Sequence, residues 1–137
     1  MSLRDSLSRY LKGQPLIELA VLFGSRARQG GSPASDVDIG LSLAKDGDNR
    51  AVRRQIEVEL GQATKKDVDV IFLDEAPPLL RFEVARDGQL LVERRHYAWA
   101  DFKAQAMIDW WDWEPIARRV NRYIIQRFRE ETADGSS

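Results

Sequence analysis

The sequence has no cysteine and a single histidine, His96, among its 137 residues. The absence of thiols excludes disulfide frameworks, thiolate zinc sites and cysteine nucleophiles. A single histidine argues equally against a His-based zinc site and against a catalytic triad led by histidine. Any chemistry that this chain performs must therefore rest on its carboxylates.

Long apolar runs and an excess of one charge sign are missing as well. The longest apolar stretch, Leu16 to Phe23, is interrupted by Glu18 and is far shorter than the ~20 residues of a membrane span. The first residues lack the apolar segment and cleavage site of a secretory signal, so we expect a cytoplasmic protein. With 21 basic and 22 acidic residues the net charge is −1, which disfavours binding to DNA, RNA or anionic lipid.

What the sequence does have is the composition of an ordinary globular protein, with 43% hydrophobic and 31% charged residues. Its length fits one domain, which we place at residues 1–137. We expect a core at about residues 15–95 and C-terminal helices at about 96–131.

Hydrophobic periodicity predicts alternating helices and strands. Apolar residues three to four apart predict a first helix that ends near Lys12, and a second helix should follow Asn49 as its cap. A short helix should begin at Ser25, and Pro77 and Pro78 are typical of a helix entry. Short apolar or alternating stretches predict strands at 16–23, 36–43, 67–72 and 89–92. From His96 onward the pattern is helical, with a break or kink near Pro115.

The first candidate for a functional site is the pair Gly24 and Ser25, where the first strand ends and a helix should begin. Unpaired backbone N–H groups and the helix dipole favour anions at such a place, and glycine lets a phosphate approach the main chain. The pair alone would more often be a plain turn.

The second candidate is the pair Asp36 and Asp38, two residues apart at the start of a strand. Their side chains leave the same face of the strand, while Val37 and Ile39 face the core. Two such carboxylates repel each other unless a cation lies between them, and oxygen donors without His or Cys suit Mg²⁺. The competing interpretation is a strand entry with solvated aspartates.

The third candidate is Asp69, which lies between Val68 and Val70 in a strand otherwise made for a core. Asp67 is on the same face and competes with it, but Asp67 follows two lysines and is more simply a solvated strand start. The flanking β-branched residues make a solvated position less natural for Asp69, so we choose Asp69 as the third carboxylate.

Together these residues resemble the signature of the DNA polymerase β-like nucleotidyltransferases. Leu22 to Arg28, with Ser35 to Ile39, is similar to the minimal nucleotidyltransferases within that superfamily. The segments Asp74 to Val84 and Arg86 to Gly88 further resemble its antitoxin branch, whose partner is a HEPN-domain toxin. The likeness extends over about residues 15 to 130. It implies an α+β fold with a small mixed sheet flanked by helices.

The resemblance also implies a reaction. Mg²⁺ would be held by Asp36, Asp38 and Asp69, and ATP would place its phosphates on Gly24 and Ser25. We expect Arg26 to pair with phosphate oxygens, with a solvated turn arginine as the alternative. The transferred group would be AMP, and the acceptor a tyrosine hydroxyl of the HEPN toxin. The alternatives are a non-catalytic antitoxin that acts by occlusion, and nucleotidyl transfer to a small molecule or an RNA end.

Two positions depart from the family pattern. Gln29-Gly30 stands where glycine is expected directly after Arg28, which shifts a turn by one residue. Gly40 replaces an apolar residue after the second aspartate, and it either weakens the strand or lets a backbone or nucleotide come close.

The C-terminal helices are the predicted docking surface for a homo- or hetero-oligomer. Aromatic and small residues recur there at helical spacing, and such a stripe is core by default. Four tryptophans within fifteen positions are many for a small domain, so at least one should be exposed and covered by a partner or a second copy. The residues are Trp99, Phe102, Ala106, Trp110 and Trp113, with Trp111 on another side.

Overall fold

The computed structural model describes the backbone of residues 2–24, 36–44 and 50–135, and the side chains among these up to Glu130. The helix expected at Ser25 and the cap expected at Asn49 lie outside the described residues. The remaining predicted helices and strands are all present. Their order is α1 (Leu3–Lys12), β1 (Ile17–Phe23), β2 (Val37–Leu43), α2 (Arg50–Thr64), β3 (Val68–Phe72), α3 (Pro78–Asp87), β4 (Gln89–Glu93) and α4 (Ala98–Gly135).

The four strands form one mixed sheet in the order β3-β2-β1-β4. β1 pairs antiparallel with both β2 and β4, whereas β2 and β3 run parallel. A parallel pair needs a crossover connection, and α2 supplies it. In the strand order β3-β2-β1-β4, β3 is an edge strand of the sheet. The fold is α+β, as the sequence predicts.

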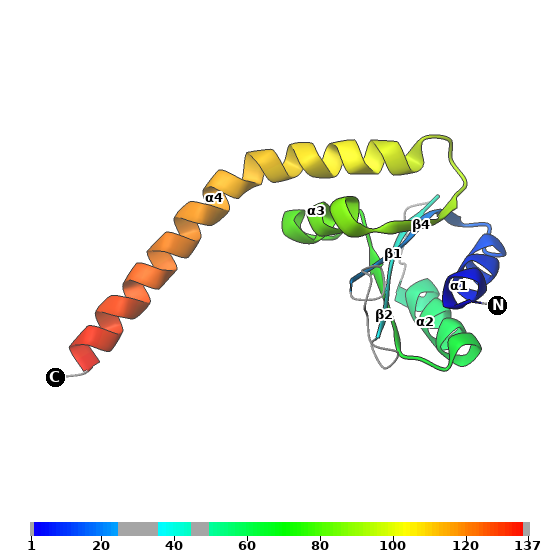
Figure 1. Cartoon of the computed structure of the whole chain (residues 1–137), viewed down its shortest axis with the longest axis horizontal. Coiled ribbons are helices and arrows are strands. Elements are labelled where there is room, and N and C mark those ends of the chain that lie inside the picture. The colour runs from blue at the N-terminus through cyan, green and yellow to red at the C-terminus, as the bar shows by residue number, and fades with distance from the viewer. Residues whose placement is uncertain (1, 25–35, 45–49, 136–137) are drawn as a thin grey trace.

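Helices cover both faces of the sheet (Figure 1). α1 and α2 pack on one face, where Leu7, Leu11, Ile56 and Leu60 join the main core cluster. Burying a leucine of this kind contributes about 2 kcal/mol to folding. The core thus includes α1, which lies before the predicted core range of residues 15–95. α3 and the first turns of α4 pack on the other face.

Hydrogen bonds from side chains hold the start of α1 and the loop that follows it. The Asp5 N–H donates to the Ser2 hydroxyl at 3.1 Å, and the Ser2 N–H donates to the Asp5 carboxylate at 3.3 Å. This reciprocal pair satisfies two N–H groups that a helix leaves open at its start. Arg94 then ties the loop after α1 to the sheet by donating to the backbone oxygens of Ile17, Lys12 and Gln14.

The C-terminal region differs from the prediction. It is one helix, α4, that begins at Ala98 rather than His96 and continues through Pro115. Figure 1 shows that α4 changes direction along its length and that its C-terminal half extends away from the sheet. Pro115 is exposed, so water can bond the carbonyl that its missing N–H leaves open. The proline therefore does not break the helix.

Candidate active site

Gly24 closes β1 in a conformation that requires glycine. Its φ of +77° lies in the left-handed region, and a Cβ on this residue would come within 2.4 Å of the Asp38 Oδ2 atom. Phe23, the last residue of β1, is the register partner of Asp38 in β2. Gly24 and the Asp38 carboxylate therefore lie next to each other, so the structure brings these two predicted site residues together.

The parallel pairing of β2 with β3 brings two predicted carboxylates together. Asp38 and Asp69 are register partners, so their side chains leave the same face of neighbouring strands. Asp36 lies two residues before Asp38 and shares that face. The alternate residues Val37 and Ile39 are fully buried on the opposite face. The structure thus places the predicted carboxylates on one face, and Asp38 is the one that lies against Gly24.

The charges of this cluster act on one another. The pKa of Asp38 is raised above its ordinary value, first by burial of the carboxyl and then by the negative charges of Asp69 and Asp36. Asp38 is half-buried, whereas Asp36 and Asp69 are exposed. A cation between these carboxylates would remove the repulsion that raises the pKa. The cluster is therefore suited to positive charge.

The donor set fits Mg²⁺ that arrives with a phosphate ligand. Within the described ranges, no three His, Cys, Asp or Glu side chains stand close enough together to hold a metal ion by themselves. Mg²⁺ usually takes one or two carboxylates and completes its shell with water and substrate phosphates. Asp38 and Asp69, which are register partners on neighbouring strands, can supply the carboxylates of such a site.

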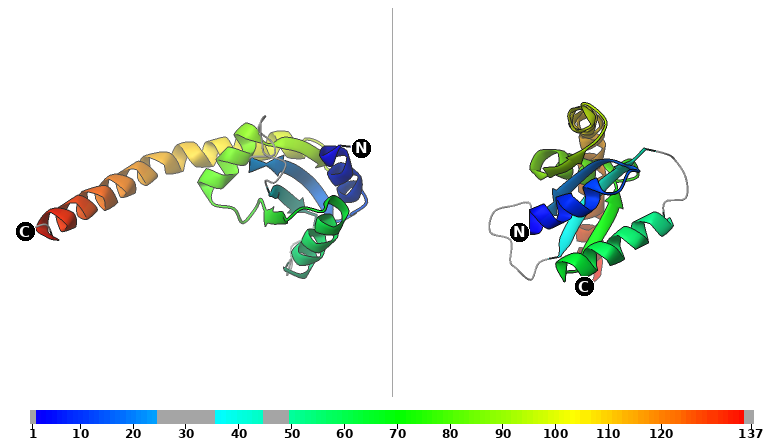
Figure 2. Two further views of the ribbon diagram at one scale, coloured as in Figure 1. Left: turned by 60° about the horizontal axis from the view of Figure 1, so that its bottom comes forward. Right: turned by 90° about the vertical axis from the view of Figure 1, so that its right-hand side faces the viewer.

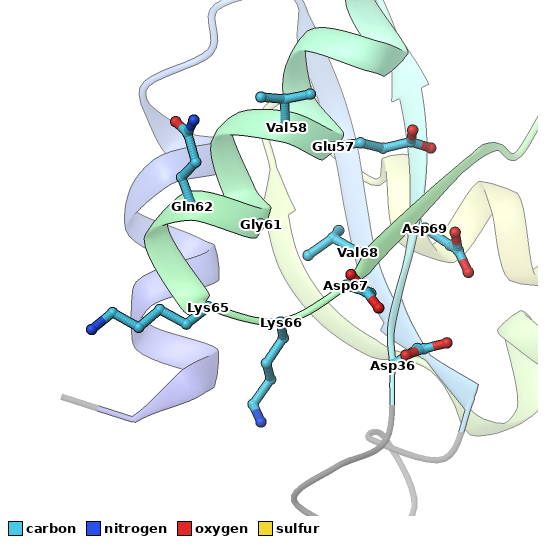
Figure 3. A pocket seen from close by; sticks show the side chains of 10 residues that line it. All are labelled: Asp36, Glu57, Val58, Gly61, Gln62, Lys65, Lys66, Asp67, Val68 and Asp69. Carbon is cyan, nitrogen blue, oxygen red and sulfur yellow. The ribbon is translucent and has the colours of Figure 1, made fainter.

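A groove of about 830 Å³ opens beside the cluster, between the C-terminal end of α2 and the start of β3 (Figure 3). In Figure 3 the side chains of Asp36 and Asp69 point toward the same side. Asp67, the competing candidate, also lines the groove. The residues along it are Asp36, Glu57, Val58, Gly61, Gln62, Lys65, Lys66, Asp67, Val68 and Asp69.

Sequence analysis did not single out the α2 side of this groove. Glu57 accepts a hydrogen bond from the Val70 N–H at 3.1 Å, and Lys65 ends α2 with a φ of +57°. Glycine usually occupies this left-handed position after a helix. The lysine is therefore recognisable as unusual only when the end of the helix is already known. Ser25 and Arg26, both predicted to bind nucleotide, lie outside the described residues.

The structure gives Gly40 a purely internal role. A Cβ on Gly40 would lie 2.6 Å from a methyl group of Leu73, so the glycine makes room for a core side chain. The expected approach of a nucleotide there is not needed to explain it. His96 is exposed, and its ring contacts the ring of Tyr97. It follows β4, which is at the opposite edge of the sheet from β3 and Asp69.

The tryptophans of α4 divide as the spacing predicts. Phe102 and Ala106 are buried, and Trp110 stacks on Phe82 of α3. Trp111 is 69% exposed and Trp113 is 40% exposed. The prediction of at least one exposed tryptophan is therefore confirmed, whereas Trp113 is less buried than its place in the stripe suggested.

The family model described as polymerase beta, nucleotidyltransferase matches residues 5–97, which include Gly24 and all three carboxylates. The chain belongs to this nucleotidyltransferase family. No curated protein matches the sequence.

Solved structures share the fold of this nucleotidyltransferase. A toxin–antitoxin structure with AMP-PNP superposes with a TM-score of 0.78 at 21% identity, over 89% of this chain and 98% of the other. An MntA-HepT toxin–antitoxin structure gives 0.73 at 20% identity, over 90% and 97% of the two chains. A complex of a tri-AMPylated Shewanella oneidensis HEPN toxin with MNT antitoxin gives 0.72 at 20% identity, over 90% and 99%.

Among the described residues of the nucleotidyltransferase, no helix is both long enough and apolar enough to span a bilayer.

Proposed function

We propose that this nucleotidyltransferase is an antitoxin that transfers AMP from ATP to a tyrosine hydroxyl of a partner HEPN toxin and so neutralises the toxin. The observation that carries the proposal is the register of Asp38 with Asp69 beside the left-handed turn at Gly24. The folds that resemble this chain support it, because one is bound to AMP-PNP and another to an AMPylated HEPN toxin.

The residues of the site divide the work of the reaction. Gly24, with Ser25, would hold the β- and γ-phosphates through backbone N–H groups. Asp36, Asp38 and Asp69 would hold Mg²⁺, which when bound neutralises phosphate charge and orients the α-phosphate. Asp69 would also draw the proton from the attacking hydroxyl. The tyrosine oxygen then bonds to the α-phosphorus, the bond to the β-phosphate oxygen breaks, and pyrophosphate leaves.

The experiment is transfer of label from α-labelled ATP to the cognate HEPN toxin in the presence of Mg²⁺. We expect label on a toxin tyrosine with the native chain and none with the double variant Asp36→Ala and Asp38→Ala. If the double variant still silences the toxin as well as the native chain, the antitoxin acts by occlusion. If label goes only to a small molecule or an RNA end, the acceptor class is wrong.

The C-terminal half of α4 is the proposed docking surface for the toxin. Its apolar side chains remain largely in solvent: Ile116 is 49% exposed, Ile124 56% and Phe128 68%. A helix that extends alone from a domain is marginal in water, and exposed apolar patches of this kind mark interfaces. Loss of toxin capture on removal of this half would support the assignment, and unchanged capture would refute it.

A further inference from the structure

The groove beside the carboxylates follows the free edge of the sheet. β3 is an edge strand, and α2 lies alongside it (Figure 2). The groove separates the first residues of β3 from the last two turns of α2 (Figure 3). The floor includes Val68 and Asp69 of β3, and the wall includes Val58 and Gly61 of α2. The groove therefore runs beside both Asp69, the third predicted carboxylate, and the outer edge of β3.

The backbone of this edge is oriented to receive another strand. The Val37 N–H donates to the Asp67 oxygen at 3.0 Å, and the Leu73 N–H donates to the Leu41 oxygen at 2.8 Å. Alternate residues of a parallel strand face the same neighbour, so the main-chain groups of Val68 and Val70 face away from β2. Glu57 Oε1 accepts from the Val70 N–H, where the carbonyl of an added strand would lie.

The geometry of transfer brings the acceptor to this edge. In an in-line displacement the attacking and leaving oxygens lie on opposite sides of the phosphorus. Gly24 directly follows β1, on one flank of Asp38, and Asp69 belongs to β3, on the other flank. If pyrophosphate leaves toward Gly24, the acceptor hydroxyl must enter from the β3 flank, where the groove lies.

The chemistry of the groove favours a polypeptide over a nucleic acid. Four carboxylates line it, from Asp36, Glu57, Asp67 and Asp69, against the two cations of Lys65 and Lys66. This excess of negative charge repels an RNA backbone. Val58 is 52% exposed and offers the groove an apolar contact.

We propose that the groove between α2 and β3 binds an extended peptide segment of the partner protein, which pairs with the outer edge of β3 and so presents the acceptor tyrosine to Asp69. Strand addition of this kind gives affinity through main-chain hydrogen bonds and selectivity through side-chain pockets. The inference rests on the proposed function and adds to it the place and conformation of the acceptor.

Filling the groove tests the inference. Gly61→Leu adds a side chain to its wall, where a Cβ meets only the Lys66 backbone oxygen at 3.4 Å. We expect kcat/KM for transfer to the toxin to fall at least tenfold, mainly through KM, with the Kd for Mg-ATP within twofold of native. Ala63→Leu places the same side chain on the same helical turn but outside the groove, and should stay within twofold in both measurements.

A second variant and a second substrate separate the possible outcomes. Val58→Lys alters an exposed groove residue without disturbing the core, so it replaces Gly61→Leu if that variant melts at a lower temperature than the native chain. Native transfer rates in both groove variants would overturn the inference and leave the proposed function standing. Labelling of RNA, with loss of that labelling in the groove variants, would overturn the peptide assignment. Absence of transfer by the native chain would instead refute the proposed function.

Discussion

The contact between Gly24 and Asp38 permits a quantitative test of how the site is built. Gly24→Ala would add a Cβ in a left-handed backbone, which costs about 1–2 kcal/mol by itself. The same Cβ would lie 2.4 Å from Asp38 Oδ2, so the carboxylate must move. Overpacking of this kind costs about 1–3 kcal/mol. We expect Gly24→Ala to lower the free energy of unfolding by about 2–5 kcal/mol.

A double-mutant cycle separates the two costs. In an Asp38→Ala background the oxygen and the Cγ atom that crowd the new Cβ are gone, and the remaining Cβ of residue 38 lies 3.6 Å away, an ordinary contact. Only the backbone cost should then remain, so Gly24→Ala should cost about 1–2 kcal/mol there. The difference is the coupling energy of the pair, about 1–3 kcal/mol.

Urea unfolding at pH 7 measures all four free energies, and Gly61→Ala provides the control. Gly61 is helical and has space for a Cβ, so alanine should stabilise the protein by about 1 kcal/mol. Binding of Mg-ATP should fall at least tenfold in Gly24→Ala because the displaced carboxylate is a proposed ligand. Equal costs in the two backgrounds would show that Gly24 and Asp38 are not in contact, and the phosphate turn would then lie elsewhere.

The pKa of Asp38 is raised in the folded state, so its charge destabilises the fold at neutral pH; Asp38→Asn should raise Tm at pH 7, and the gain should vanish as pH falls below the unfolded value near 3.8. Gly40→Ala should cost about 1–3 kcal/mol in urea unfolding, and less in a Leu73→Ala background, because its Cβ would lie 2.6 Å from the leucine methyl. Arg94→Lys should cost about 1 kcal/mol in the same assay, since three backbone carbonyls lose the guanidinium donor. Removal of residues 116–137 should change the unfolding free energy of the sheet domain by less than ~1 kcal/mol, because the side chains described there are mostly exposed.

The sequence predicts most helices and strands because the spacing of apolar residues in each matches the face that the helix or strand buries. The nearly all-apolar segment before Gly24, interrupted only by Glu18, becomes β1, which is covered on both faces by helices. The carboxylates follow from a related pattern: Asp36 and Asp38 lie two apart, around the buried residue Val37, and Asp69 lies between the buried residues Val68 and Val70. What spacing alone cannot give is their alignment, because the register of parallel strands depends on how α2 crosses between them.

Other features depend on contacts between distant parts of the chain, and these were missed. The role of Gly40 is set by Leu73, thirty-three positions later, so the local pattern leaves open a weakened strand or the close approach of a backbone or a nucleotide. The groove exists because β3 is at the edge of the sheet, and strand order is not visible in a single sequence. The local preference at Pro115 predicts a break or a kink and cannot decide between them; the structure has one helix that continues through Pro115 and changes direction along its length.

The proposed groove and the proposed docking helix imply a division of labour that kinetics can separate. If the C-terminal half of α4 holds the toxin, it raises the effective concentration of the acceptor segment at Asp69 without touching the reacting atoms. Removal of residues 116–137 should then raise KM for the whole toxin while leaving kcat/KM for a free acceptor peptide unchanged. Gly61→Leu should reduce transfer to both substrates. If the truncation impairs the free peptide equally, α4 supports the site itself, and the separation of docking from chemistry is wrong.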